Sequence, residues 1–270
     1  MPAVSIELDG ARVLVTGASG GIGNAIARAL HERGASLAIT GRRVDALEAL
    51  RAELGDRVEV LQADLASRGE LAALPGRAGD VDVLVANAAL PASGNLDTFS
   101  GEEIDRALDI NLRAPMKLTR ELLPRMRERG SGHLVFVSSM SGKVAQGGAS
   151  VYSATKFGMR GFAFALRDEL HGSGVGVTTV FPGFIRDAGM FADSGVKLPA
   201  GVGTRSPRQV ANAVVRGIER NRGEIDVAPF SFRFGGWLFG GAPELVTRLT
   251  RAGGAAKVAQ GLAEGQRDKR

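Results

Sequence analysis

The stretch from residue 12 to residue 23 reads RVLVTGASGGIG, a short β-branched run that leads into a glycine-rich turn. An apolar-periodic segment over residues 22–33 follows, and Gly34 is placed to end it as a helix. Glycines let the backbone turn sharply and approach a pyrophosphate, and a helix N-terminus offers free N–H groups with a partial positive charge. The succession of strand, turn and helix therefore predicts a dinucleotide site, with a tight structural turn that binds no nucleotide as the alternative.

Strand-like and helix-like segments alternate along most of the chain. The expected strands are 12–16, 36–40, 57–62, 81–86, 133–138, 175–181 and 224–228. The expected helices are 22–33, 44–54, 69–74 (ended by Pro75 and Gly76), 101–129 (bent near Pro115), 151–171 and 207–220. This alternation predicts an α/β fold, a doubly wound parallel sheet of about seven strands with helices on both faces, that is, a Rossmann fold. Ligands of such sheets bind beyond the carboxyl ends of the strands, where the strand order reverses.

Composition limits the possible functions. Of the 270 residues, 44% are hydrophobic and 23% charged, so the chain can bury a full core. We predict one domain over residues 1–228, with a substrate lid at about 184–206, and a basic, aromatic-containing extension at 229–270. Cysteine is absent and the three histidines lack ligand spacing, so neither disulfides nor a metal site is expected. The sequence has no signal peptide and no membrane-spanning run, which predicts a cytoplasmic protein.

The extension carries most of the charge. Residues 229–270 hold seven Lys/Arg against three Asp/Glu, which accounts for +4 of the net +5, so the body is nearly neutral and no nucleic-acid partner is expected. Five of the fourteen aromatic residues fall between Phe230 and Phe239. We favour packing of this segment over the substrate cleft or a partner subunit, with weak peripheral membrane contact as the alternative. From Ala252 onward we expect the chain to fray.

Two arginines follow the second strand. A site for NAD would place an acid about 20 residues past the glycines, to accept hydrogen bonds from the ribose. Here Gly41 stands in that place and Arg42 and Arg43 follow. Because guanidinium groups recognise phosphate through charge-assisted forks, the 2′-phosphate of NADP(H) is the expected partner, and NAD(H) is less favoured. The alternative is a solvated helix start.

The only tyrosine of the chain, Tyr152, precedes Lys156 by four residues. On a helix these two side chains share a face. A free phenol has a pKa near 10, and a neighbouring ammonium, together with the positive ring of oxidised nicotinamide, is expected to lower it toward the range useful for proton transfer. The alternative is a half-buried tyrosine beside a lysine that extends to solvent.

With these motifs the chain resembles the short-chain dehydrogenase/reductase family in its single-domain form, over roughly residues 8–228. The likeness rests on the TGASGGIG turn at 16–23, Asp64-Leu65, Asn87-Ala88, Asn111, Ser138-Ser139, Tyr152 with Lys156, and Pro182-Gly183.

The resemblance implies a role for each catalytic residue. Tyr152 would be the general acid or base, and Lys156 would bind the nicotinamide ribose and lower the tyrosine pKa. Ser139 would hydrogen-bond the substrate oxygen, and Asn111 would hold a water that links Lys156 to solvent. A strand-end turn for Ser139 and a helix bend for Asn111 are the alternatives.

The resemblance also implies cofactor contacts. Asp64 would contact adenine, with a helix cap as the alternative; Asn87 would support the end of the fourth strand; and the backbone near Ile185 would meet the carboxamide. Together with the two arginines, the expected cofactor contacts are Gly17, Ser19, Gly21, Ile22, Gly23, Arg42, Arg43, Asp64, Leu65, Asn87, Tyr152, Lys156, Pro182, Gly183 and Ile185.

Three residues depart from the family pattern. Ala89 stands where a glycine is usual after the fourth strand, Asp187 where a threonine often contacts the carboxamide, and Gly20 where NADP-preferring members often have a basic residue. Cofactor choice then rests on Arg42 and Arg43 alone.

These features predict an NADP(H)-dependent oxidoreductase that acts on the CH–OH or carbonyl group of a small, apolar substrate. The alternative is a catalytically silent NADP(H)-binding redox sensor, which would not need all four catalytic residues. Family resemblance suggests a homodimer or homotetramer, and the long helix at 151–171, apolar nearly all round, is expected to pack on the sheet and on a partner subunit.

Overall fold

The computed structural model describes residues 6–196, 198, 202–252 and 255–266. The strands of the sheet are β1 (Arg12–Thr16), β2 (Ser36–Gly41), β3 (Val58–Gln62), β4 (Val83–Ala86), β5 (Gly132–Val137), β6 (Val175–Pro182) and β7 (Glu224–Val227). The helices are α1 (Gly21–His31), α2 (Val44–Leu54), α3 (Arg68–Ala78), α4 (Gly101–Leu108), α5 (Ala114–Arg129), α6 (Ser150–Glu169), α7 (Pro207–Arg220), α8 (Phe230–Gly241), α9 (Pro243–Ala252) and α10 (Ala255–Gly265).

The sheet is parallel in every pairing among these residues, in the order β3-β2-β1-β4-β5-β6-β7. The order reverses between β1 and β4, which places a ligand crevice at their carboxyl ends. The predicted doubly wound α/β fold is confirmed, and each of the seven strands falls within two residues of its expected position.

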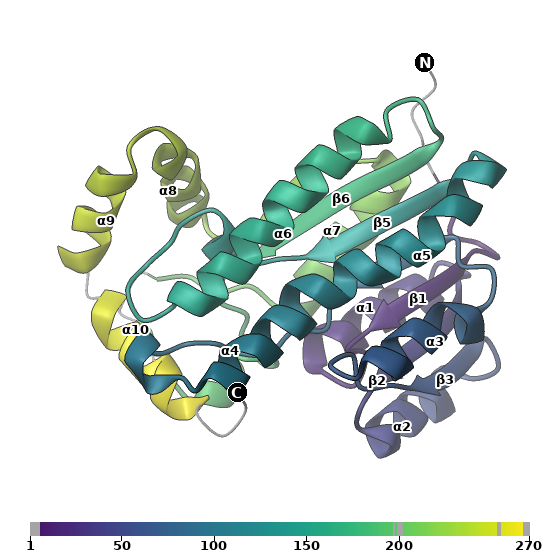
Figure 1. Cartoon of the computed structure of the whole chain (residues 1–270), viewed down its shortest axis with the longest axis horizontal. Coiled ribbons are helices and arrows are strands. Elements are labelled where there is room, and N and C mark those ends of the chain that lie inside the picture. The colour runs from purple at the N-terminus through teal and green to yellow at the C-terminus, as the bar shows by residue number, and fades with distance from the viewer. Residues whose placement is uncertain (1–5, 197, 199–201, 253–254, 267–270) are drawn as a thin grey trace.

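Helices cover both faces of the sheet, with α3, α5 and α6 in front of it in the view of Figure 1. Side chains of β1 alternate between the two layers: Val13 and Val15 pack with α1 and α7, and Leu14 packs with α3, α5 and α6. Because both faces are buried, the central strands β1 and β4 are apolar along nearly their whole length, whereas the edge strands β3 and β7 include the exposed acids Glu59 and Glu224.

Two helices differ from the prediction. Pro75 does not end α3, which continues to Ala78, since Leu71, Leu74, Pro75 and Ala78 are all buried on one side of it and compensate for the missing N–H. The expected bend near Pro115 is a π-helical turn at Asp109–Arg113, which joins α4 to α5.

The C-terminal helices α8, α9 and α10 lie together beside the sheet, at the end where α6 begins (Figure 1). Chain ends tend to be poorly ordered, but the expectation of fraying from Ala252 onward is wrong for residues 255–265, which form α10. Residues 197 and 199–201 of the expected lid, and residues 253–254 and 267–270 of the extension, lie outside the described part of the chain. Within the described part, no helix is both long and apolar enough to cross a lipid bilayer.

Candidate active site

The glycine turn between β1 and α1 is formed by close backbone contacts. Gly17 has a positive φ of 67°, and a Cβ placed on it would lie 2.8 Å from the Ala88 Cα. A Cβ on Gly23 would lie 2.2 Å from the Gly17 carbonyl oxygen. No side chain caps the N-terminus of α1, and its first turn contains no acidic residue. The first amides of α1 are therefore available to an anion.

Asn87, directly after β4, holds this turn in place. Its side-chain Nδ2 donates to the Thr16 carbonyl at 3.0 Å and to the Gly17 carbonyl at 3.3 Å. The Thr16 hydroxyl in turn accepts hydrogen bonds from the backbone N–H groups of Asn87 and Ala88. The two strands at the reversal point are thus joined through Asn87.

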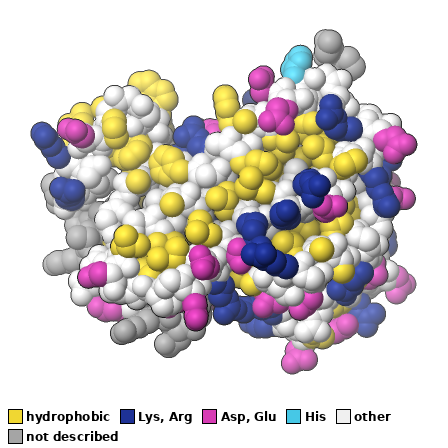
Figure 2. Space-filling model, viewed as in Figure 1, with side chains coloured by type: hydrophobic (Ala, Val, Ile, Leu, Met, Phe, Trp, Pro, Cys, Tyr) yellow, Lys and Arg dark blue, Asp and Glu magenta, His cyan; other side chains and the backbone are white. Residues whose placement is uncertain are grey.

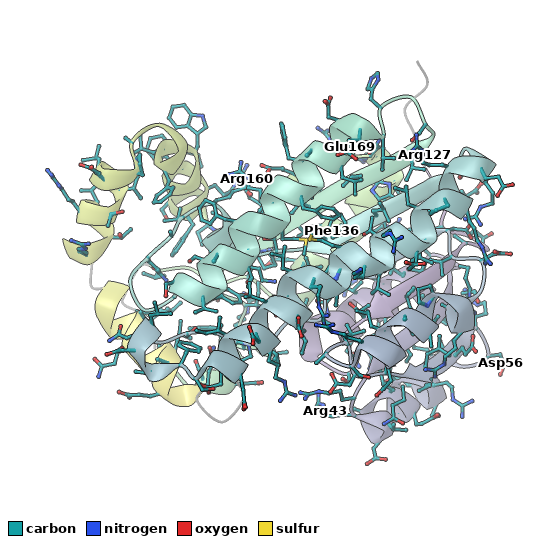
Figure 3. All side chains as sticks on the ribbon, viewed as in Figure 1. Arg43, Asp56, Arg127, Phe136, Arg160 and Glu169 are labelled. Atoms are coloured by element: carbon teal, nitrogen blue, oxygen red, sulfur yellow. The ribbon has the colours of Figure 1, made fainter. Side chains whose placement is uncertain are left out.

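The end of β2 lies beside the same turn. Arg43 donates to the Ser19 carbonyl, and Arg42 is exposed. A Cβ on Gly41 would lie 2.8 Å from the Ser19 Oγ, so the position where an acid was expected for NAD has little room for any side chain. Figure 3 shows Arg43 at the edge of the molecule, away from the buried Phe136 between the sheet and its helices.

Asp64 and Leu65 follow β3. The Asp64 carboxylate accepts from the Ala66 N–H at 3.0 Å, and Ser67 is the residue that caps α3. Leu65 is 6% exposed and packs in the core under α3. The helix-cap alternative for Asp64 is therefore wrong, because the carboxylate closes a turn before the cap.

Tyr152 and Lys156 lie one turn apart on α6, and the lysine Nζ is 5.5 Å from the centre of the tyrosine ring. Lys156 donates to the Val137 carbonyl at 3.3 Å, and burial lowers its pKa to about 8. Burial raises the pKa of Tyr152 to about 12, although a hydrogen bond with Ser139 lowers it in part. In the protein alone desolvation is the larger effect on the Tyr152 pKa, and the lowering expected with the nicotinamide ring in place stays a prediction.

Ser139 starts the short 3-10 turn Met140–Gly142, and its Oγ accepts from the Ser141 N–H at 3.1 Å. The neighbouring Ser138 Oγ donates to the Lys156 carbonyl at 3.3 Å, which ties the end of β5 to α6. Ser139 and Tyr152 therefore face the same space, from a strand end and from a helix.

Asn111 lies in the π turn and is 1% exposed. Its side-chain oxygen accepts from the Leu90 N–H at 2.7 Å, and its Nδ2 donates to the Leu90 carbonyl at 2.9 Å. The amide is thus paired with the loop after β4, which it fixes near α6. Its part in a water chain to Lys156 remains a prediction.

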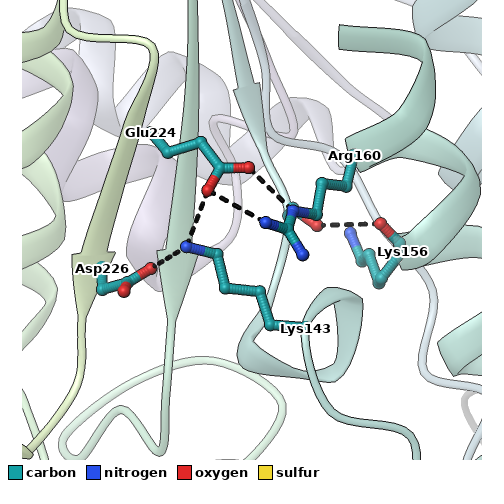
Figure 4. Close-up of polar contacts among 6 residues, drawn as sticks. Lys143, Lys156, Arg160, Glu224 and Asp226 are labelled. Atoms are coloured by element: carbon teal, nitrogen blue, oxygen red, sulfur yellow. Dashed lines mark hydrogen bonds and ion pairs between the residues drawn. The ribbon is translucent and has the colours of Figure 1, made fainter. Parts of the chain in front are cut away.

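A cluster of charges behind the catalytic group was not anticipated from the sequence (Figure 4). Lys143 lies 2.9 Å from Glu224 and 2.6 Å from Asp226 on β7, and its Nζ is 4.1 Å from the centre of the Phe181 ring. Arg160 of α6 lies 2.7 Å from Glu224. Burial alone would raise the pKa of Glu224, but the hydrogen bonds from Arg160 and Lys143 outweigh it and the pKa is lowered. The cluster anchors the loop after Ser139 to β7 and α6. In the sequence, only the alternating acids Glu224 and Asp226 on the expected last strand could have indicated it.

Ser139, Tyr152 and Lys156, the expected catalytic residues, open into a cavity of about 400 Å³. One side of it is lined by these three residues together with Ile22, Asn87 and Ala89, where Ala89 stands in the place of the glycine that is usual in the family. Pro182, Gly183 and Ile185 line it after β6, where the Gly183 N–H donates to the Val227 carbonyl at 3.0 Å. Eight of the seventeen expected cofactor and catalytic residues thus line one space. The other nine lie outside its lining: Gly17, Ser19, Gly21, Gly23, Arg42, Arg43, Asp64, Leu65 and Asn111.

The segment after β6 lies on the first turn of α1. A Cβ on Gly21 would be 2.2 Å from the Ala188 Cβ, and Gly189 lies against Ile22. Asp187 has a positive φ of 71° and an exposed side chain, which pairs with Arg186 at 3.3 Å. Its carboxylate is therefore engaged by a neighbour at the surface.

The C-terminal helices complete the cavity wall. Packing of this segment over the cleft or a partner subunit was the interpretation favoured from the sequence, with membrane contact as the alternative. The helices contribute Ser231, Phe232 and Gly235 from α8, Val246 and Thr250 from α9, Ala259 and Leu262 from α10, and Gln266 beyond it. Phe184 packs on Phe191 at 4.9 Å and on Phe232 at 5.6 Å between ring centres. Gln266, 3% exposed, donates to the Met190 carbonyl at 2.9 Å. These contacts hold α10 on the segment after β6.

No group of three or more His, Cys, Asp or Glu side chains in the described part of the chain could hold a metal ion.

Known proteins share this arrangement. The sequence model described as short chain dehydrogenase matches residues 11–197. The ketoacyl reductase HetN of Nostoc sp. is 39% identical over 228 residues, covering 82% of this chain and 79% of that protein. The NADP-dependent 3-hydroxy acid dehydrogenase YdfG of Escherichia coli K12 is 38% identical over 178 residues, covering 64% of this chain and 72% of that protein.

Solved structures agree. A short-chain dehydrogenase from Sphingobium yanoikuyae in complex with NADPH superposes with a TM-score of 0.76 at 30% identity, covering 86% of this chain and 94% of that one. A serine dehydrogenase complexed with NADP+ gives a TM-score of 0.73 at 30% identity, covering 81% and 95%. With the family match over most of the chain and this site at the reversal point of the sheet, the protein belongs to the short-chain dehydrogenase family of oxidoreductases.

Proposed function

We propose that the protein is an NADP(H)-dependent oxidoreductase that transfers a hydride between nicotinamide and the carbonyl or CH–OH group of an apolar substrate, with Tyr152 as the general acid or base. The observation that carries the proposal is the single cavity in which Ser139, Tyr152 and Lys156 lie directly beside the glycine turn. A sensor that only binds the nucleotide has no need for these side chains to face one space.

The residues present fit the nucleotide. The uncapped first turn of α1 suits a pyrophosphate, and exposed Arg42 at the end of β2 suits a 2′-phosphate. Arg42 and Arg43 favour NADP(H) over NAD(H), as do the NADP-named relative and the NADP-bound solved structures.

The bound nicotinamide would supply or accept the hydride. The chain would supply the proton and the polarisation: Ser139 and Tyr152 hydrogen-bond the substrate oxygen, and Tyr152 gives it a proton in reduction. With a pKa of about 12 in the protein alone, Tyr152 carries its proton at neutral pH, and giving that proton up requires that the phenolate be stabilised. Lys156 would hold the nicotinamide ribose and lower the cost of the phenolate.

The substrate side of the cavity is apolar, with Met140, Phe184, Phe232, Val246 and Leu262 in its wall. The two curated relatives act, by name, on a ketoacyl compound and on a 3-hydroxy acid. We extend that class to this chain and propose a ketone or secondary alcohol on an apolar acyl skeleton, beside the first part of the expected lid, from Phe184 to Phe191, which lines the cavity.

The assembly is proposed from surface chemistry. Leu108, Met116 and Phe164 of the α4–α6 face are large apolar side chains that are exposed in the single chain. Figure 2 shows hydrophobic side chains gathered over α5 and α6. We propose that this face pairs with a second copy to form a homodimer or homotetramer. A separate proposal, carried over from the sequence, is that the protein works in the cytoplasm.

The test is a fluorescence titration of the purified protein with NADPH and NADH, followed by a panel of apolar ketones, 3-oxoacyl thioesters, aldehydes and secondary alcohols. Selective NADPH binding with turnover of one substrate class is the expected result. Tight NADPH binding without turnover across the panel would favour the sensor. Failure to bind either nucleotide would mean that the site is closed to a dinucleotide, with the Ala89 methyl group in the cavity lining as the first candidate, and would overturn the proposal.

A further inference from the structure

Helices α8 and α9 each have two apolar sides. The inner side carries Phe232 and Gly235 of α8 and Val246 of α9, which line the cavity. The outer side carries large apolar groups that no part of the described chain covers well: Phe230, Phe234 and Trp237 of α8, and Leu245 and Leu249 of α9. We call these five residues the outer face.

The outer face is well exposed. Phe230 is 77% exposed, Trp237 75% and Leu249 60%. The three aromatic residues are spaced i, i+4 and i+7 on one stripe of α8, with ring centres 6.3 Å apart for Phe230 and Phe234 and 5.8 Å apart for Phe234 and Trp237. An apolar group of this size, rimmed by polar residues, marks a surface that contacts something.

The charges beside the outer face are mainly positive. Arg233, Arg248 and Arg251 are exposed on the same two helices, whose only acid is Glu244. None of the ion pairs found among the described residues involves these arginines. A two-fold contact between outer faces would bring the arginines of both copies together with little counter-charge. An anionic surface would complement them.

We propose that the outer face docks on an anionic lipid bilayer, with its aromatic and leucine side chains in the headgroup region and the arginines on lipid phosphates. The protein then lies on the membrane and does not cross it. Since the inner sides of the same helices line the cavity, docking places α8 and α9 between the cavity and the bilayer surface. The consequence that an apolar substrate reaches Tyr152 from the bilayer rests on the function proposed above; the docking itself does not.

The test uses Trp237, the only tryptophan of the chain, as its own reporter. Its emission is recorded while the full-length protein is titrated with vesicles of phosphatidylcholine alone or mixed with phosphatidylglycerol. We expect a shift to shorter wavelength and quenching by brominated lipid with the anionic vesicles, both weakened at high salt.

Variants separate the two contributions. Phe230→Ser with Phe234→Ser should weaken vesicle binding about tenfold or more, whereas Leu96→Ser, at an apolar residue 58% exposed elsewhere on the surface, should leave it unchanged. Arg233→Gln and Arg248→Gln should each weaken vesicle binding about fivefold. The pair Arg127→Gln and Arg208→Gln is the matched control.

Two outcomes would overturn the docking. One is no spectral change with either vesicle. The other is emission that is already at short wavelength without vesicles and changes with protein concentration, because a second copy would then cover the outer face. NADPH binding and turnover of a water-soluble ketone, measured on the same samples without lipid, report separately on the proposed function.

Discussion

The cavity has two sides that are built differently: the side at the glycine turn, where we propose that the nucleotide binds (the nucleotide side), and the apolar side, where we propose that the substrate binds (the substrate side). On the nucleotide side, the turn at Gly17 and Gly23 is fixed by backbone contacts in which an added Cβ would come within 2.8 Å of a neighbour. On the substrate side, the wall is made by apolar side chains such as Phe184 and Phe232, whose ring centres lie 5.6 Å apart across 48 positions of the sequence. The first construction leaves almost no freedom of residue type, and the second accepts many apolar solutions. Reaction class should therefore follow from the first side and substrate choice from the second.

The largest expected effect is at the point where the two sides meet. Tyr152→Phe removes the proton donor but keeps the ring, so kcat should fall by about 10² to 10⁴ while the dissociation constant for NADPH changes little. Stopped-flow reduction of the best substrate and a parallel NADPH titration measure both. Near-normal turnover would show that another group donates the proton.

Measuring the free energy of unfolding at acidic pH should show whether the two sides of the cavity unfold as one cooperative unit. His133 is buried in β5, where its Nε2 lies 2.8 Å from the Thr178 hydroxyl, and desolvation, with a smaller contribution from Arg167, lowers its pKa to about 3. In the unfolded chain the His133 imidazole takes up a proton below about pH 6.5, whereas in the folded chain it stays neutral down to about pH 3. The full contribution of this difference to the free energy of unfolding is therefore present above about pH 6.5. It should be lost at up to about 1.4 kcal/mol for each pH unit toward pH 3.

Chemical denaturation between pH 7 and pH 4, followed by NADPH binding and by Trp237 emission, measures this loss. His133→Gln should flatten the pH dependence. Coincident transitions from the two probes would place α8 in the same folding unit as the sheet. An early change in Trp237 emission alone would show that the substrate wall unfolds by itself.

Removal of the Arg42 guanidinium should weaken nucleotide binding and leave the substrate side of the cavity unchanged. Arg42→Ala should weaken NADPH about 10- to 100-fold and NADH about twofold or less, because only NADPH carries the 2′-phosphate. Arg208→Ala, at an exposed position on α7, is the control. Equal losses for both nucleotides would refute the phosphate contact.

The smallest effect is expected on the substrate side. Phe232→Ala should raise KM for an apolar substrate about tenfold and leave NADPH binding unchanged, since Phe232 lines the cavity away from the glycine turn. Phe230→Ala is the matched control on the same helix, because its side chain is 77% exposed; KM with a water-soluble substrate should be unaffected. If both variants weaken NADPH, the two sides are not separable.

The difference between the sides also explains what could be predicted. Strands buried on both faces and a glycine turn at the end of the first one are local signals, so the sheet and the positions of Tyr152, Lys156 and Asn87 follow from the sequence. The pairing of Lys143 with Asp226 joins residues 83 positions apart and has no local signature. Likewise, α10 is stabilised by distant contacts such as that of Gln266 with Met190, which composition cannot reveal.

Burial explains the remaining differences. Burial raises the pKa of Tyr152 in the protein alone, whereas the sequence, which shows the nearby Lys156 but not the depth of the site, indicates only a lowering. Pro75 was expected to end a helix, but its ring is buried with Leu74 and the helix continues. In both cases a local rule was outweighed by the surroundings of the residue in the fold.

The π turn at Asp109–Arg113 makes chain length itself part of the active site. It acts as one residue inserted into an otherwise regular helix. Deleting a single residue there would replace the wide turn by regular α-helical turns. Asn111, which lies in the wide turn, would then lose the position from which its side chain pairs with the Leu90 backbone. Over this segment a substitution keeps the wide turn, whereas a one-residue deletion would remove it and release the loop after β4 that Asn111 holds.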